Sequence, residues 1–413
     1  MNSPFVDHRL ENGLRVVIER MPEVKGAAAG FYSRTGGRDE TPELAGVSHF
    51  LEHMCFKGTA KRHWRQITID FDDMGSTYNA YTMKDRTFYY GWVRADSITQ
   101  QIELLADMMK SLLPPEEFDM EKNVILEEIA MSNDHLENLA YDFLNEKIFP
   151  GHALSWPVLG YEKTVRDMTR DQMHDYFVRR YAPNNLVLVV AGNVEPQRII
   201  DVADELCGDW QPSPPISSRS KPTFTPGKSC MVYSRYNRQE LGHVFPSNGG
   251  CDPLEESAET VASILGGDNS RFYWEIEQKG IAPSVSVWRI DYEDCGVMVL
   301  AGECDPEKCE ELFDAMHAEA VKLTRDGPRP EEVQRVKNRR RTSLAIESES
   351  PYYRLGQLLD DVDYRGGPRT VEQRLAEVDA VSRKSIGEYL EEYPITEGGH
   401  VISVGPRDWI PSN

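Results

Sequence analysis

The hydrophobic pattern alternates short apolar runs with amphipathic stretches. Leu14–Ile18 and Ala27–Tyr32 have the length and residue types of strands, and the Thr-, Phe- and Tyr-rich stretch 78–94 predicts a pair of strands. Helical periodicity covers three stretches: 43–57, 97–112 and 116–149. Because strands and helices come in runs, with few strand–helix–strand units, the order favours an α+β fold over a doubly wound parallel sheet.

A proline- and serine-rich stretch, 211–228, divides the chain into halves of similar length and predicts a linker. Two local patterns recur across it. Pro115 and Pro330 each begin a helical stretch with two glutamates, and Thr169 and Ser382 each precede a helix followed by an apolar strand that ends in glycine. The offsets are 215 and 213 residues. We therefore expect two tandem homologous αβ domains, 1–210 and 229–413, each a mixed or antiparallel sheet packed with helices.

Composition excludes several classes of protein. The 413 residues include 46 Lys+Arg and 68 Asp+Glu, a net charge of −22, which argues against a nucleic-acid partner because such binding needs a basic face. No apolar run approaches the roughly 18 residues that span a bilayer, so no membrane partner is expected. The first residues do not have the pattern of a signal peptide, and seven scattered cysteines are typical of reduced thiols. These features predict a cytoplasmic location.

The pentapeptide His49-Phe50-Leu51-Glu52-His53 carries the clearest chemistry. Histidines four apart share one face of a helix and can bind the same metal ion, and Glu52 flanks that face as a carboxylate that could activate metal-bound water. A chain of this composition would contain such a run by chance about 0.04 times. The alternative is a pair of structural histidines on a partly buried helix.

A third ligand is expected from the acidic helical stretch that begins near residue 116. Glu121 and Glu128 are seven apart and lie on one face, while Glu127 is turned about 100° away from Glu128. One carboxylate could bind the metal and another could support a ligand. Spacing alone does not choose between Glu127 and Glu128, and an acidic helix can also be merely solvated.

These residues resemble a known family. The pentapeptide, with Met54–Thr59 after it, is similar to the inverted zinc motif of the pitrilysin and mitochondrial processing peptidase family, whose members are inverzincins. The chain looks most like the two-domain bacterial type. Further similar segments cover nearly all of the first half: Asn12–Val17, Ser33–Glu40, Asn79–Thr82, Glu121–Glu128, Pro157–Gly160, Tyr181–Leu186 and Ala191–Asn193.

The resemblance implies that 1–210 is a peptidase domain with one zinc ion per chain and that 229–413 is a homologous domain without a metal site. The zinc ligands would be His49, His53 and Glu128, the last because 74 residues separate it from His53, as is usual in the family. It also implies that Glu52 is the general base and Glu121 a supporting carboxylate. The segment at Asn79 and Ala80 would be an edge strand that holds substrate backbone. The alternative for Asn79 is a turn residue that opens a strand.

The second half departs from the family pattern. Active members carry an Arg and, seven residues later, a Tyr that help to hold substrate, whereas this chain, with one residue deleted between the two positions, has Glu277 and Pro283 there. The resemblance therefore implies a zinc endopeptidase that cleaves extended or unfolded peptides in a closed chamber, working as a homodimer or as a heterodimer with a related subunit. The alternative is a zinc-binding subunit that is inactive alone. The basic run at 337 and 339–341 could contact a partner or be a solvated helix face.

Overall fold

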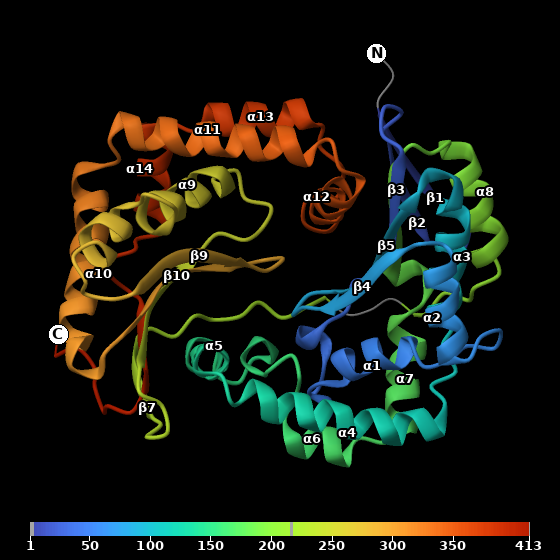
Figure 1. Ribbon diagram of the computed structural model, residues 1–413, viewed down its shortest axis with the longest axis horizontal. Coiled ribbons are helices and arrows are strands. Elements are labelled where there is room, and N and C mark those ends of the chain that lie inside the picture. The colour runs from blue at the N-terminus through green and yellow to red at the C-terminus, as the bar shows by residue number, and fades with distance from the viewer. Residues whose placement is uncertain (1–3, 215–217, 413) are drawn as a thin grey trace. The chain divides into compact units, whose positions relative to one another are not determined.

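The structure is a computed structural model that describes residues 4–214 and 218–412, and it forms two compact units, each built around one β-sheet (Figure 1). The first unit comprises Met1–Ala130, Trp156–Ser220 and Ala345–Val371. The second comprises Met131–Ser155, Lys221–Leu344 and Glu372–Asn413. Each unit thus includes a helical segment from the other half of the sequence.

The sheet of the first unit has six strands in the order β1-β2-β6-β3-β5-β4. Only β2 and β6 pair in parallel, so the sheet is mixed, and β4 lies at its edge. The strands are β1 Phe5–Arg9, β2 Arg15–Arg20, β3 Gly26–Ser33, β4 Thr77–Thr82, β5 Thr87–Arg94 and β6 Leu186–Gly192.

Both faces of this sheet are apolar, because successive buried residues of its central strands point to opposite sides. Val16 and Ile18 belong to the core on one side of β2, whereas Val17 belongs to the core on the other. The first core is completed by residues of several helices: α1 Val47–Cys55, α2 Trp64–Asp73, α3 Ile98–Met108, α4 Pro115–Ser132, α6 Glu162–Asp167, α7 Arg170–Arg180 and α8 Pro196–Cys207. The opposite core is completed by α12 (Pro351–Tyr364), which comes from beyond the linker.

The second unit has a five-stranded sheet in the order β7-β11-β8-β10-β9, in which only β7 and β11 are parallel. One of its cores includes residues of α5 (Leu136–Ile148), which precedes the linker in sequence. The strands are β7 Gly227–Val232, β8 Gln239–Ser247, β9 Ser284–Asp291, β10 Gly296–Cys304 and β11 His400–Gly405. The other helices are α9 Glu255–Gly266, α10 Cys309–Asp326, α11 Pro330–Glu347, α13 Val371–Ala380 and α14 Arg383–Glu392.

The structure confirms the α+β class, the mixed sheets and the repeated pattern. The helices α4 and α11, which begin at Pro115 and Pro330, are both 18 residues long, and Thr169 and Ser382 are both helix N-caps that accept a backbone N–H. The domain ranges 1–210 and 229–413 stay a prediction, and the compact units differ from them by the exchanged segments. Part of the predicted linker is folded, since β7 begins at Gly227, and residues 215–217 lie outside the described part.

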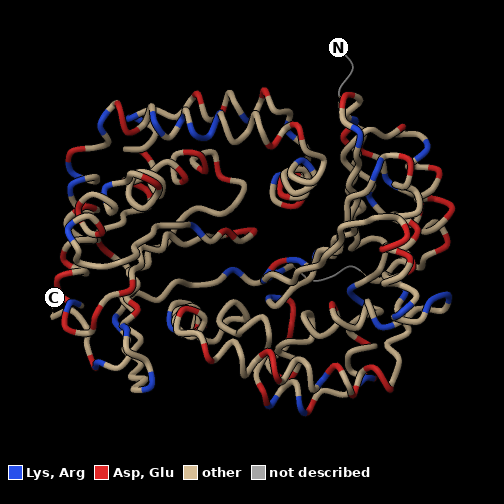
Figure 2. The backbone as a smooth tube through the Cα atoms, in the orientation of Figure 1, with Lys and Arg blue, Asp and Glu red and all other residues tan. Residues whose placement is uncertain are grey.

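Two predicted helices are interrupted. The stretch 43–57 contains a short 3-10 turn before α1, with Gly46 between them at φ +96°, a conformation that favours glycine. The stretch 116–149 divides into α4 and α5. Acidic and basic residues are interspersed along the helices (Figure 2), and among the described residues no helix is long and apolar enough to cross a membrane.

Candidate metal centre

The helix α1 presents His49, Glu52 and His53 on the side opposite its buried stripe. Its fully buried apolar residues follow helical spacing and anchor it in the first core: Val47, Phe50, Leu51 and Met54. His49 and His53 therefore lie together on the other side, with ring centroids 4.7 Å apart. The expected shared face is present.

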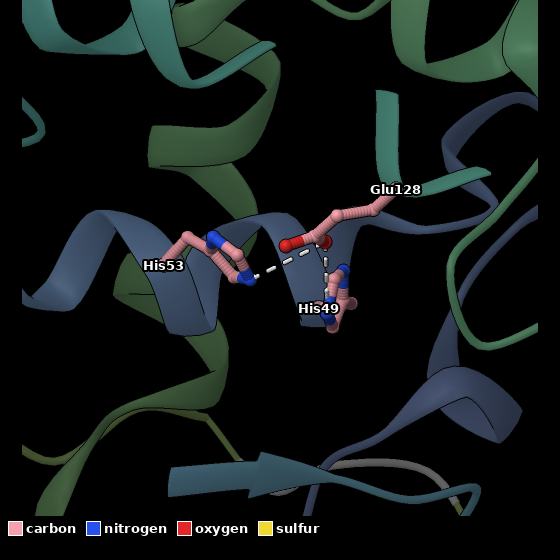
Figure 3. Close-up of side chains that lie close together, drawn as sticks. All are labelled: His49, His53 and Glu128. Carbon is pink, nitrogen blue, oxygen red and sulfur yellow. Dashed lines mark ion pairs between the residues drawn. The ribbon is translucent and has the colours of Figure 1, made fainter. Parts of the chain in front are cut away.

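Glu128 reaches this pair from α4 (Figure 3). Its Oε2 lies 3.9 Å from His49 Nε2 and 3.7 Å from His53 Nε2, and one ligand atom from each residue lies within 4.8 Å of the others. Ligand atoms around a tetrahedral zinc ion are about 3.4 Å apart, and two imidazoles with a carboxylate are a usual zinc donor set, so these residues fit zinc. Glu127 is exposed and is not in the group, which is the only one of its kind among the described residues.

His49 has the protonation state that a metal ligand needs. Burial, together with the neighbouring His53, lowers the pKa of His49 to about 3, so its imidazole is neutral at physiological pH. Its Nδ1 is buried and has no hydrogen-bond partner in the described structure.

Glu121 lies beside His53, and its role as a supporting carboxylate stays a prediction. The side chain is 5% exposed, and its Oε1 lies 2.7 Å from His53 Nδ1, which donates to it, so that Nε2 is the ring nitrogen that faces Glu128. Burial raises the pKa of Glu121, but hydrogen bonds from His53 and Lys57 outweigh it and the pKa lies below its usual value. The second donor, Lys57 Nζ, pairs with Glu121 Oε2. Sequence reasoning gave Lys57 no role, although it lies in Met54–Thr59, the segment that follows the pentapeptide.

Glu52 lies beside the edge strand. Its Oε2 accepts a hydrogen bond of 2.6 Å from the hydroxyl of Thr82, the last residue of β4. Burial raises the pKa of Glu52, while the bond from Thr82 and the charge of His53 offset part of that rise. Thr82 is a second residue that sequence reasoning did not assign, although it closes the Asn-Ala-Tyr-Thr segment.

Asn79 and Ala80 are in the expected edge strand. Asn79 is the third residue of β4, so it does not open the strand, and its exposed side chain accepts a hydrogen bond of 2.9 Å from the backbone of Ala80. The strand β4 is last in the sheet order, which agrees with the expectation of an edge. Contact with substrate backbone stays a prediction for both residues.

In the second half of the chain, Glu277 and Pro283 stand where the family pattern has Arg and Tyr. Glu277 Oε1 accepts a hydrogen bond of 3.2 Å from the backbone of Val285, and Pro283 lines a cavity of about 620 Å³ in the second unit. The basic run of α11 is paired within that unit: Lys337 and Arg341 with Asp379, Arg339 with the backbone of Asp268, and Arg340 with Glu256. That run therefore holds α11 to its neighbours.

Known proteins share this combination of sequence and fold. The sequence model described as insulinase, peptidase family M16, matches residues 15–162, and the model described as the peptidase M16 inactive domain matches residues 167–340. A Bacillus subtilis protein named as an uncharacterised zinc protease is 30% identical over 408 residues, covering 97% of this chain and 98% of that relative. The chain belongs to peptidase family M16.

A similar M16 relative from Rickettsia felis, also named as an uncharacterised zinc protease, is 31% identical over 362 residues, which are 86% of each protein. The crystal structure of a protease from Helicobacter pylori has a TM-score of 0.90 at 18% identity, covering 97% of this chain and 99% of that one, and so supports the fold. The resemblance to the pitrilysin family and the two tandem domains are thus confirmed, and zinc is the metal named for the relatives.

Proposed function

We propose that this M16 protein is a zinc-dependent endopeptidase that hydrolyses extended peptides or unfolded segments. The observation that supports this most strongly is the convergence of His49, His53 and Glu128, with the Glu52 carboxylate and the end of an edge strand beside them. His49, His53 and Glu128 would hold one zinc ion per chain. When bound, zinc supplies Lewis-acid chemistry: it polarises a carbonyl group and lowers the pKa of water.

The protein groups have separate roles in this proposal. Glu52 is the general base: Thr82 holds its Oε2, so Oε1 is available to accept a proton from the attacking water and pass it to the leaving amine. Glu121 keeps the His53 ring in one orientation and tautomer. The edge of β4, at Asn79 and Ala80, would hold the substrate backbone as an added strand.

The second half of the proposal concerns assembly. A closed chamber formed with a second, related subunit would restrict the substrates to extended chains, in a homodimer or a heterodimer. The alternative function is that of a zinc-binding subunit, inactive alone, whose partner supplies the missing Arg and Tyr. The specific observation in its favour is that Glu277 is used to hold the backbone of Val285 and that Pro283 has no hydroxyl. A cytoplasmic location is part of the same proposal.

The test is a cleavage assay of the purified chain on a quenched fluorescent peptide library. Wild type is compared with Glu52→Gln, and with Glu127→Gln as a control that alters an exposed carboxylate outside the ligand group. We expect cleavage by wild type and Glu127→Gln, none by Glu52→Gln, and one zinc per chain in all three. Cleavage by Glu52→Gln at the wild-type rate would refute the role of Glu52. Zinc retained without cleavage by any variant would favour the heterodimeric subunit.

A further inference from the structure

The turn that joins β4 to β5 is unusual because its charged residues are buried. Lys84, Asp85 and Arg86 are 5%, 3% and 5% exposed, although the tip of a hairpin normally lies in solvent. Buried charges are tolerated only when they are paired, so this turn must be fixed by its surroundings.

The first support comes from the loop that follows β3. The backbone N–H groups of Gly37 and Arg38 donate to the carbonyls of Met83 and Lys84, at 3.0 and 2.8 Å. The loop and the turn approach so closely that a Cβ atom on Gly36 would lie 2.2 Å from the carbonyl oxygen of Met83. Here glycine is required by the close approach of two backbones.

Two arginines close over the acidic residue of the turn. Arg38 Nη1 lies 3.3 Å from Asp85 Oδ1, and Arg219 Nη1 lies 3.4 Å from the same oxygen. Arg219 is a residue of the predicted linker, which in its described part is therefore attached to this turn.

The third support is α12. Arg86 Nη2 lies 2.5 Å from Asp360 Oδ1, and its Nη1 lies 3.1 Å from Asp363 Oδ2. The guanidinium also lies 5.2 Å from the ring centroid of Tyr364, within range of a cation–π contact. A helix from beyond the linker thus completes the pairing of a turn in the first sheet.

The position of this turn gives it a consequence for the site. Thr82, whose hydroxyl donates to Glu52 Oε2, directly precedes the turn. We infer that Thr82 is a positioning residue for Glu52, and that the buried turn, clamped by α12 through Arg86, keeps Thr82 in place. This inference rests on the proposed function, because it assigns a purpose to the geometry of the proposed base.

The first experiment tests Thr82 itself with two substitutions. Thr82→Val keeps the shape and removes the hydroxyl, so kcat should fall about tenfold or more, as for the loss of a hydrogen bond to a charged group, with KM and zinc content unchanged. Thr82→Ser restores the hydroxyl and should recover most of kcat. A rise in KM with unchanged kcat would indicate a structural role and overturn the inference. So would a fall in kcat that is equal in Thr82→Val and Thr82→Ser.

The second experiment tests the clamp. Asp360→Asn weakens the pair with Arg86 but leaves Asp363 in place, and because Asp360 is about half exposed the variant should fold. We expect faster amide hydrogen exchange in residues 77–94 and a kcat about threefold lower. Asp96→Asn is the matched control, since it removes an exposed pair with Arg94 at the far end of β5 and should change neither.

The double variant Thr82→Val/Asp360→Asn decides whether the clamp acts through Thr82. If it does, Asp360→Asn causes no further loss of kcat once the hydroxyl is absent. If the two losses of kcat are additive, or if amide hydrogen exchange in residues 77–94 is unchanged in Asp360→Asn, the proposed role of α12 is refuted. If wild type cleaves peptides and Thr82→Val has the same kcat, this inference is refuted and the proposed function is not. If wild type does not cleave peptides, the proposed function is refuted and this inference with it.

Discussion

Removing the charge of Glu121 should weaken zinc binding without removing a zinc ligand. The carboxylate accepts from two donors, His53 Nδ1 at 2.7 Å and Lys57 Nζ. Glu121→Gln has the same shape but only one acceptor oxygen, so its amide NH2 must face one of the two donors. Either the His53 ring loses its orienting partner or Lys57 is left beside a donor.

The magnitude follows from the part that His53 plays. Loss of a group that orients a metal-binding histidine costs 10- to 100-fold in metal affinity, or about 1.4–2.7 kcal/mol. Because Glu121 is 5% exposed, solvent does not restore the lost hydrogen bond fully, and we expect a result in the upper part of that range.

The assay is competition for zinc between the protein and a chromophoric chelator at fixed pH. Glu127→Gln serves as control, because it makes the same chemical change at an exposed position of α4. Glu128→Gln should lose more affinity than Glu121→Gln, since it removes a proposed ligand. An affinity of Glu121→Gln within twofold of wild type, or an equal fall in Glu127→Gln, would refute the reasoning.

Two predictions concern stability. Burial, with Glu137 and Glu303 nearby, raises the pKa of Glu240 from 4.5 to about 8, so the folded state keeps a proton that the unfolded chain releases, and stability falls as the pH rises through that window. The free energy of unfolding of Glu240→Gln, measured in urea, should therefore gain about 1–2 kcal/mol over wild type between pH 5 and pH 8.5. Glu303→Gln should gain less, because it removes only a neighbouring charge and leaves Glu240 buried. The second prediction concerns a buried ion pair: Arg354, which is 1% exposed, binds both oxygens of the buried Glu19 at 2.9–3.1 Å. Arg354→Met should lower the free energy of unfolding by about 3–5 kcal/mol, because it leaves the charge of Glu19 buried without this partner. The double variant Glu19→Gln/Arg354→Met should recover most of this lost free energy of unfolding. A loss below about 1 kcal/mol in Arg354→Met would contradict this account.

The local parts of the site could be predicted from the sequence because they depend on helix geometry. Spacing places His49 and His53 on one face of α1, and Glu121 and Glu128 on one face of α4, whatever the rest of the chain does. The choice of Glu128 over Glu127 rests on the family resemblance and stays a prediction, and Glu128 is the carboxylate that lies close to both histidines. The interruption between α4 and α5 was missed, since periodicity continues across residues 133–135 without glycine or proline.

The contacts made between distant segments could not be predicted. The apolar face of α12 shows that the helix is buried, but its spacing does not indicate which sheet it covers. The pairing of Thr82 with Glu52 depends on how β4 passes α1, and the pairing of Arg86 depends on α12. Each of these needs the tertiary arrangement, which one sequence does not supply.

The exchange of helices also affects how the protein is made. The first unit, which holds the metal centre, includes Ala345–Val371, so a ribosome must synthesise 371 of the 413 residues before that unit is complete. Until then, the face of the first sheet that α12 covers, with Val17 and Tyr32 on it, has no covering helix. A fragment cut at the linker would keep every proposed zinc ligand and yet expose this face, so the peptidase half cannot be expected to persist as a soluble product of limited proteolysis.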